Sequence, residues 1–212
     1  MQRCPGARWQ LSDLPRRAMG ANPVPLRALC RRVLPSVPEQ VRCIRAYSGR
    51  MKYRHLHHAG NFADVHKHVT LLAALGALKR KEKGFLYFET HAGRGVYDLA
   101  DSAAESRHGI GRLVGTECVA APLRRYLVLL EQLRAARGGA RLYPGSPWLA
   151  ASELRAQDRA VFIESVPEEA RALERALSAV GTARIRAEVG DGFEKLRSAL
   201  PPSQGRALTL ID

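Results

Sequence analysis

Long apolar runs and cysteine motifs are both missing from this sequence of 212 residues, and each absence excludes a class of protein. No apolar run approaches the roughly 18 residues that a membrane-spanning helix needs, so we expect a soluble protein with no membrane partner. The four cysteines form no Cys-x-x-Cys pair, and only Cys118 lies beyond residue 50. This cysteine usage is typical of free thiols in a reducing compartment.

Acidic residues are scarce at the start of the chain. Residues 1–50 hold ten Arg, no Lys and only two acids, whereas the net charge of the whole chain is +14. The rest of the sequence is therefore only moderately basic. The net charge of the whole chain favours a polyanionic partner such as nucleic acid. The folded part carries less of this charge, so it gives weaker support for such a partner.

Residues 1–50 also show no sustained helical or strand periodicity, and they hold six of the 12 prolines. We expect this segment to be disordered. An Arg-rich, acid-poor start resembles an organellar transit peptide. Alternatively, Met51 is the natural start, which we favour because all seven His and all six Lys lie after it.

Four short apolar runs each end on an acid or run into a turn that carries one. The runs span residues 85–88, 160–163, 185–189 and 207–211, and the acids are Glu89, Glu164, Asp191 and Asp212. In an open parallel α/β sheet, ligands bind beyond the carboxyl ends of the strands. The pattern therefore predicts a ligand site where Glu164, Asp191 and Asp212 meet the turn His91-Ala92-Gly93-Arg94-Gly95, which follows Glu89.

Segments with helical periodicity or capping signals surround and separate these runs. The best defined begins after Asn61, which can cap it, and Asp64 is favourable near the positive end of the helix. The predicted helices span residues 62–82, 122–137, 146–157, 167–180 and 191–200.

The alternation of strands and helices predicts an α/β fold with a doubly wound parallel sheet. The stretch from about 97 to 143 is too long for one crossover, so we interpret it as a helical insertion after the first strand. The predicted organisation is an extension over residues 1–50, an N-terminal flap and helix over 51–84, and a core over 85–212 that carries the insertion.

The glycine turn alone is weak evidence for a cofactor site, because a purely structural tight turn explains it equally well. Asp98 stands where a dinucleotide fingerprint has its third glycine, which disfavours a nicotinamide oxidoreductase. However, Glu164 can accept from both hydroxyls of a ribose, and Asp191 can accept from an adenine amino group. Together with the turn, these acids predict a site for S-adenosylmethionine (SAM).

Histidines cluster near the start of the flap and first helix, at His55, His57, His58, His66 and His68. His-x-His or His-x-x-x-His spacing could bind zinc. No His-Glu-x-x-His arrangement and no nearby cysteine support a metal, so we predict none. We favour contact with phosphate or a base from the flap, with His66 solvated.

The turn Tyr143-Pro144-Gly145-Ser146-Pro147 leads into a predicted helix, and two interpretations of it remain open. Ser146 can cap the helix, or the turn can line the cofactor pocket as well. The residues alone do not choose between them.

In combination, several motifs closely resemble the bacterial RlmJ family, which are SAM-dependent adenine-N6 methyltransferases of 23S ribosomal RNA. The resemblance covers Met51 to Asp212 without a large gap. The matching motifs are Tyr53-Arg54-His55, His58-Ala59-Gly60-Asn61, Ala63-Asp64-Val65, Lys67-His68, Thr90-His91-Ala92-Gly93, Tyr143-Pro144-Gly145-Ser146-Pro147, Asp191-Gly192-Phe193 and Leu210-Ile211-Asp212.

The resemblance implies a Rossmann-like class I methyltransferase with an inserted helical subdomain. It implies a bacterial cytoplasmic monomer that acts on 23S RNA free of ribosomal proteins. It implies RNA or adenine contact by Tyr53, His55 and Lys67. The residues implied to contact SAM are His68, His91, Ser146, Glu164, Asp191 and Gly192.

Asp212 matches the first residue of the family's catalytic Asp-Pro-Pro-Tyr motif and is the last residue of this sequence. Its carboxylate would accept a hydrogen bond from the adenine amino group and aim the nitrogen at the cofactor methyl. We expect the sheet of this chain to be incomplete and its fourth strand to be an open edge. We expect these 212 residues to bind SAM weakly without methylating RNA.

Two other functions stay open. A DNA adenine-N6 methyltransferase shares the Asp-Pro-Pro-Tyr chemistry, and methylation of duplex DNA would reveal it. A non-catalytic RNA-binding module would show salt-dependent RNA binding and no SAM binding.

Overall fold

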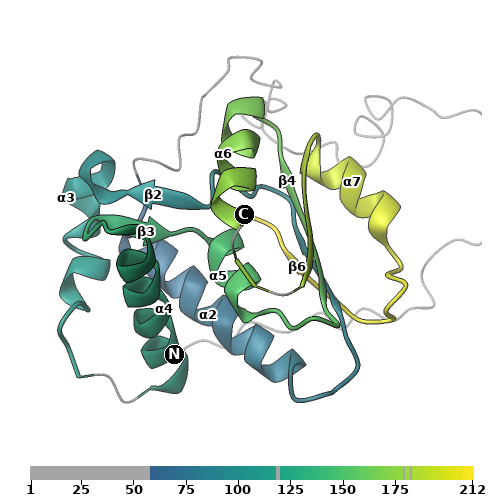
Figure 1. Ribbon diagram of the computed structural model, residues 1–212, viewed down its shortest axis with the longest axis horizontal. Coiled ribbons are helices and arrows are strands. Elements are labelled where there is room, and N and C mark those ends of the chain that lie inside the picture. Colours follow the sequence, from purple (N-terminus) through teal and green to yellow (C-terminus); the bar gives the residue numbers. More distant parts are fainter. Residues whose placement is uncertain (1–57, 118–119, 179, 182) are drawn as a thin grey trace, which may run out of the picture. The chain divides into compact units, whose positions relative to one another are not determined.

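The computed structural model describes residues 58–212 except 118–119, 179 and 182 (Figure 1). The expectations for residues 1–50, the proposed start at Met51, and the RNA contacts of Tyr53 and His55 lie outside the described residues. No helix in the described part of the chain is long and apolar enough to cross a membrane.

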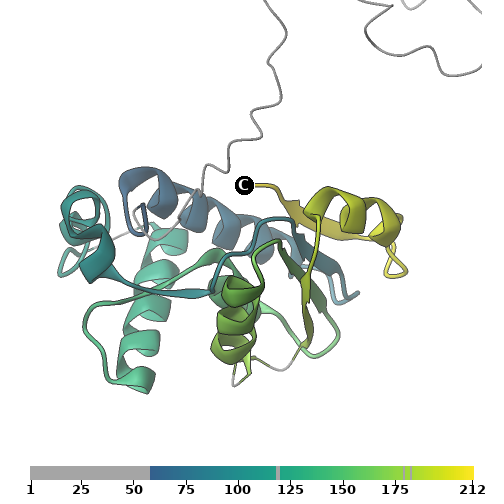
Figure 2. The same ribbon diagram turned by 90° about the horizontal axis from the view of Figure 1, so that it is seen from above.

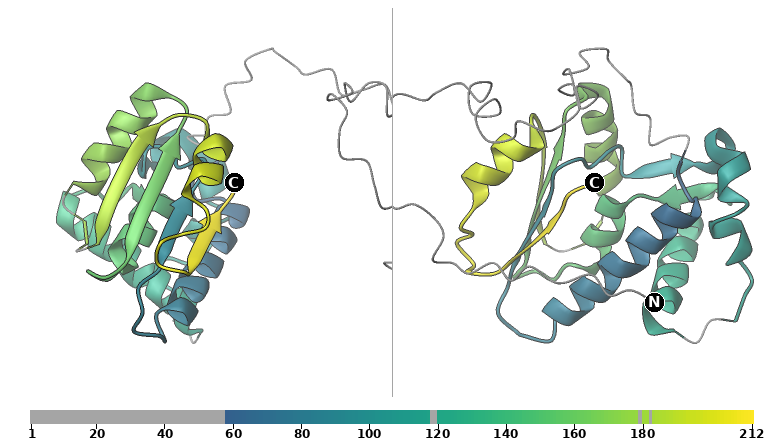
Figure 3. Two further views of the ribbon diagram at one scale, coloured as in Figure 1. Left: turned by 90° about the vertical axis from the view of Figure 1, so that its right-hand side faces the viewer. Right: turned by 180° about the vertical axis from the view of Figure 1, so that it is seen from behind.

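A four-stranded parallel sheet lies at the centre of the described residues, in the order β5-β4-β1-β6. Figure 3 shows the four strands side by side. Leu86 of β1 is in register with Arg159 of β4 on one side and Ala207 of β6 on the other. The strands are β1 (Leu86–Glu89), β4 (Arg159–Glu164), β5 (Arg184–Val189) and β6 (Ala207–Leu210).

This sheet confirms the predicted α/β fold and the four predicted strands, with ends shifted by a residue or two. Strands β1 and β4 lie in the middle of the sheet and are largely buried, whereas the residues of β6 are half-buried. Among the described strands, β6 has a neighbour on one side only, so it forms an edge.

Helices cover both faces of the sheet. Helix α6 (Pro167–Leu177) and helix α7 (Gly192–Ala199) lie on opposite sides of it (Figure 2). Leu173 and Leu177 of α6 pack with Phe162 of β4 in the core next to the sheet. Burial of such side chains contributes about 1.5–3 kcal/mol each, which makes this core the main source of stability.

Helix α2 (Phe62–Leu78) precedes the first strand and packs against α4 (Ala121–Arg137) and α5 (Ser146–Glu153). Asn61 caps α2 as predicted, because its side chain accepts a hydrogen bond from the Asp64 backbone N–H. The prediction that α2 continues to residue 82 was wrong. The helix ends at Leu78, and the basic residues after it form a turn instead.

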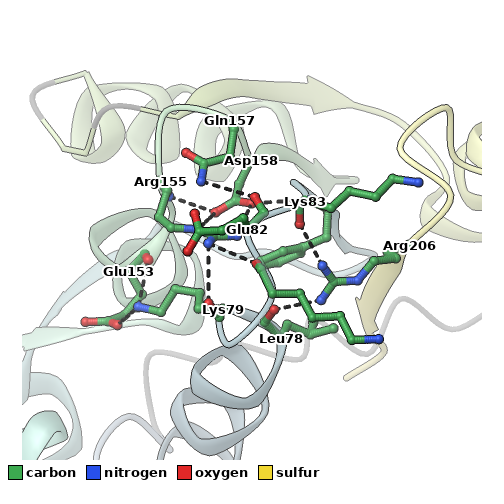
Figure 4. Close-up of polar contacts among 11 residues, drawn as sticks. Leu78, Lys79, Glu82, Lys83, Glu153, Arg155, Gln157, Asp158 and Arg206 are labelled. Atoms are coloured by element: carbon green, nitrogen blue, oxygen red, sulfur yellow. Dashed lines mark hydrogen bonds and ion pairs between the residues drawn. The ribbon is translucent and has the colours of Figure 1, made fainter.

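A network of hydrogen bonds fixes that turn at the end of the sheet away from the polar strand tips (Figure 4). The guanidinium of Arg155 donates to the carbonyls of Lys79 and Lys81 and to the buried carboxylate of Asp158. Arg206 donates to the carbonyls of Leu78 and Lys83. These bonds pair backbone oxygens at the end of α2 and in the turn that follows it.

The segment between β1 and β4 contains a small antiparallel sheet that the sequence analysis did not predict. Strand β2 (Val96–Asp98) pairs with β3 (Leu142–Pro144), and Tyr97 is opposite Tyr143. Between them lie η3 (Leu99–Ser102), α3 (Ala103–Ser106), η4 (Ile110–Arg112) and α4. In the apolar core of this segment, Tyr126, Leu130 and Leu133 of α4 pack with Tyr143 of β3. We keep the interpretation of this segment as an insertion.

Candidate ligand site at the strand ends

A cavity of about 220 Å³ opens beside the carboxyl ends of β1 and β6. The start of α2 forms one side of it, and the turn into α5 forms another. The side chains and backbone that line it belong to His58, Ala59, Asn61, Ala63, Asp64, Lys67, His68, His91, Ala92, Tyr97, Gly145, Ser146 and Asp212. Segments far apart in the sequence therefore meet where the predicted ligand would bind.

Lys67 connects two carboxylates across this cavity. Its Nζ atom lies 3.0 Å from Asp64 Oδ1, one turn earlier in α2, and 2.8 Å from Asp212 Oδ2, just beyond β6. Helical spacing explains the first contact, because residues three apart lie on one face. The second contact links α2 to the end of the sheet.

This triad shifts two pKa values in directions that keep the charges present. Burial raises the pKa of Asp64, but the charges of His68 and Lys67 and the Gly60 N–H outweigh it and lower the value to about 2. Burial lowers the pKa of Lys67, but Asp64 and Asp212 outweigh it and raise the value. Both groups are therefore ionised at neutral pH.

His68 is completely buried behind Lys67. Its Nδ1 atom lies 3.1 Å from the hydroxyl oxygen of Tyr143, which also accepts a hydrogen bond from the Tyr126 hydroxyl at 3.0 Å. On its other side, Nε2 lies 3.4 Å from Asp64 Oδ1. This chain of polar contacts fixes the plane of the imidazole at the back of the cavity.

Ser146 is tied to a buried acid rather than to its own helix. Gly145 is the N-cap of α5, and the Ser146 hydroxyl donates a 2.5 Å hydrogen bond to Glu89 Oε1. The other oxygen of Glu89 accepts from the Tyr87 hydroxyl at 2.8 Å. Burial raises the pKa of Glu89 to about 7, although both hydroxyls lower it.

This geometry resolves the two interpretations of the turn into α5. The capping interpretation was wrong, because the Ser146 side chain makes no capping hydrogen bond. Gly145 and Ser146 instead line the cavity.

The glycine turn after β1 rests on the acid at the end of β4. The Gly93 N–H donates to Glu164 Oε2 at 2.8 Å, and the Val166 N–H donates to Oε1 at the same distance. Gly93 has a positive φ of 64°, which favours glycine. The turn and Glu164 therefore form one unit, which joins the first two strand ends.

The end of β5 joins this unit through Gly192. A Cβ atom on Gly192 would lie 2.2 Å from the carbonyl oxygen of Thr90, so only glycine allows this approach. Asp191 caps α7 by accepting from the N–H groups of Phe193 and Glu194. The ring of Phe193 meets His91 edge-on, with centroids 5.5 Å apart.

The predicted site residues therefore divide into two adjacent groups. Lys67, His68, His91, Ser146 and Asp212 line the cavity. Glu164, Asp191 and Gly192 lie at the neighbouring strand ends and do not line it. The sequence analysis gave no site role to Asp64 or Glu89, although the positions of both, at a helix start and a strand end, were signals.

Within the described residues, no three His, Cys, Asp or Glu side chains lie close enough to hold a metal ion. Of the five clustered histidines, only His58 and His68 line the cavity among those described. His66 is exposed on another side of α2.

Two curated proteins are similar to about three quarters of this chain. The ribosomal RNA large subunit methyltransferase J of Haemophilus influenzae is 38% identical over 166 residues, and that of Escherichia coli K12 is 39% identical over 166 residues. In both cases the match covers 76% of this chain and 58% of the relative. The match thus spans a little over half the length of these relatives.

A solved structure and a family model agree with these relatives. A crystal structure of a Legionella pneumophila protein, described with the family model DUF519, has a TM-score of 0.66 and 38% identity. The match covers 73% of this chain and 57% of that one. Residues 82–212, more than half of the chain, match the model of the family ribosomal RNA large subunit methyltransferase D, RlmJ. The chain therefore belongs to the RlmJ family of ribosomal RNA methyltransferases, and its parallel sheet is the Rossmann-like fold of such enzymes.

Proposed function

We propose that this chain supplies the cofactor site and part of the catalytic site of an enzyme that methylates the N6 amino group of an adenine in 23S ribosomal RNA, with SAM as methyl donor. The observation that carries the proposal is the convergence of Lys67, His68, Ser146 and Asp212 on one cavity beside the strand ends. Family membership supports ribosomal RNA as the substrate.

The residues at the strand ends fit a cofactor that carries a nucleoside. Glu164 is held by two backbone N–H groups and is 8% exposed, so it can also accept from ribose hydroxyls. The close approach of Gly192 to Thr90 brings the end of β5, with Asp191, next to the turn that carries His91, which supports an adenine contact from these residues. When bound, SAM supplies an electrophilic methyl group on a positively charged sulfur.

Asp212 is suited to hold the target amino group. The lone pair of an adenine amino nitrogen is delocalised into the ring, so that nitrogen is a poor nucleophile. A carboxylate that accepts one amino hydrogen localises the lone pair and fixes its direction. Lys67 Nζ lies 2.8 Å from Asp212 Oδ2, and this ion pair restricts the orientation of the carboxylate. Most of the rate acceleration then comes from alignment.

The same proposal gives RNA contact to Tyr53, His55 and Lys67. A target adenine has to leave its stack to reach Asp212, and an aromatic ring would hold it there. The basic charge of the chain favours such a polyanion. We propose a monomer that acts in the bacterial cytoplasm on 23S RNA free of ribosomal proteins.

The test is methyl transfer from tritiated SAM to unmodified 23S RNA without ribosomal proteins, by a protein that contains this chain and has the full length of its relatives. The proposal predicts that digestion releases labelled N6-methyladenosine and that Asp212→Asn lowers the rate at least about a hundredfold, since removal of a transition-state contact costs roughly 3 kcal/mol. Label in duplex DNA but not in RNA would overturn the RNA assignment. RNA binding without any cofactor binding would overturn the enzymatic one.

A further inference from the structure

A second groove lies on another side of α2, apart from the cavity at the strand ends. It runs between α2, η4 and the start of α4. Its lining consists of Phe62, Val65, His66, Val69, His108, Gly109, Arg112, Leu113 and Leu123. The floor is apolar, and polar side chains stand at the rim.

Phe62 is the most unusual residue of this groove. It is 74% exposed, the highest value among the large apolar residues of the described chain. Its ring stacks on that of His66, with centroids 6.3 Å apart and planes inclined by 28°. Two nearly parallel rings, open to solvent, offer a flat surface for a third.

The charge of the groove favours an anionic occupant. His66, His108 and Arg112 lie exposed along it, and none of the described residues that line it is acidic. Arg112 makes no ion pair with a described residue, so its guanidinium is available. An aromatic surface beside the cation of Arg112 is the combination that binds single-stranded nucleic acid, through stacked bases and a neutralised phosphate.

The groove and the cavity of the candidate site lie on neighbouring faces of α2. Successive helical residues are about 100° apart, so Phe62 faces the groove while Ala63 faces the cavity. In the next turn His66 and Lys67 repeat this division. The two faces are thus separated by no more than the helix diameter of about 10–12 Å, which neighbouring nucleotides of one strand can span.

We propose that this groove binds a nucleotide of the RNA strand next to the target adenine, with its base stacked on Phe62 and a phosphate on Arg112. The inference rests on the proposed function for the choice of RNA. It adds a second contact that holds the strand in place while the target base occupies the cavity. It also makes Phe62 and Arg112 positioning residues for the substrate.

The experiment measures binding of a short, fluorescently labelled single-stranded RNA to the 212-residue chain by anisotropy. We expect Phe62→Ala to weaken binding at least about fivefold, because one stacked base contributes roughly 1–3 kcal/mol. Phe62→Trp, which retains a stacking surface, keeps the affinity, whereas Phe62→Leu does not. Val128→Ala removes another exposed apolar side chain, on α4, and serves as the control.

The contribution of Arg112 is read from the salt dependence. Arg112→Gln lowers the slope of log K against log salt by about 0.7, the value for one contact to a single strand. Arg171→Gln removes an equal charge from an exposed position on α6 and leaves the slope unchanged. All variants share the Arg-rich residues 1–50, so the contribution of that segment cancels in each comparison.

Unchanged RNA affinity in both Phe62→Ala and Arg112→Gln would overturn the inference, and would mean that the groove takes a protein or nothing. A photochemical test gives a second decision, because RNA that carries 5-iodouridine crosslinks to a stacked aromatic ring. The crosslinked peptide is expected to contain Phe62, and crosslinks that all lie elsewhere would contradict the proposal. Calorimetry with S-adenosylhomocysteine measures cofactor binding and does not depend on RNA affinity or crosslinking. A failure of the proposed function can therefore be distinguished from a failure of this inference.

Discussion

Lys67 and Asp212 are 145 positions apart in the sequence, yet the Nζ of one lies 2.8 Å from Oδ2 of the other. The same ammonium lies 3.0 Å from Asp64. One lysine thus separates two carboxylates that would otherwise repel each other at the mouth of the cavity. The electrostatics of the candidate site depend on this arrangement.

Lys67→Met should therefore raise the pKa of Asp64 from about 2 toward its ordinary value of 3.8. Loss of the cation removes one of the charges that stabilise the ionised form. Carbon-detected NMR titration of the Asp64 carboxyl measures the value. Lys195→Met is the matched control, because Lys195 pairs with Glu188 of β5, at the edge of the sheet opposite to β6. An Asp64 pKa that stays near 2 would show that Lys67 does not hold it.

Asp64→Asn should lower the free energy of unfolding at neutral pH by about 2 kcal/mol, because that is the free energy that corresponds to the lowered pKa of Asp64. The folded-state pKa of Asp64, about 2, is below the ordinary value of 3.8. Its stabilisation is therefore complete above pH 3.8 and is lost as the pH falls toward 2. Denaturant unfolding at pH 7 and pH 3 measures the difference between the two proteins. An equal difference at both values would contradict the assignment.

Glu89→Gln should have the opposite dependence on pH. Burial raises the folded-state pKa of Glu89 from 4.5 to about 7. The folded state thus binds the proton more tightly, and this residue lowers the stability of the wild type by about 2.5 kcal/mol as the pH rises from 5 to 8. The variant does not ionise, so its stability should fall less over that range. Unfolding curves at the two pH values test this, with the exposed Glu174→Gln as control. Parallel losses in wild type and variant would refute the prediction.

Gly192→Ala should destabilise the chain by about 1–3 kcal/mol, as overpacking does. The new methyl group would lie 2.2 Å from the Thr90 carbonyl oxygen, so α7 would have to move away from β1. Gly76→Ala is the matched control. No atom lies within 4 Å of its new methyl group, and the helix should gain about 0.5–1 kcal/mol. Equal melting temperatures for the two variants would contradict the close approach.

Much of the fold could be predicted from local patterns. The apolar runs of β1, β4, β5 and β6 and the cap at Asn61 depend on neighbours in sequence, and all were confirmed. The β2–β3 pair was not predicted, because each strand has only three residues and their pairing joins positions more than 40 apart. No periodicity can be detected over so short a length.

The site could be predicted only as a location. The strand-end rule brought the glycine turn together with Glu164, and the structure has Gly93 bonded to it. The bond of Ser146 to Glu89 and the burial of His68 depend on how α2 and α5 pack on the sheet. Such partners are set by tertiary structure, so a motif gives the residue but not the group that it contacts.

The central claim is that the strand ends bind a nucleoside thioether, and calorimetry with S-adenosylhomocysteine tests it most directly on the 212-residue chain. We predict a single site whose affinity falls at least about tenfold in Glu164→Gln, since a hydrogen bond to a charged group contributes about 1.5–3 kcal/mol. Glu168→Gln, an exposed neighbour in the first turn of α6, should leave the affinity unchanged. Absence of binding, or equal affinity in all three proteins, would contradict the account.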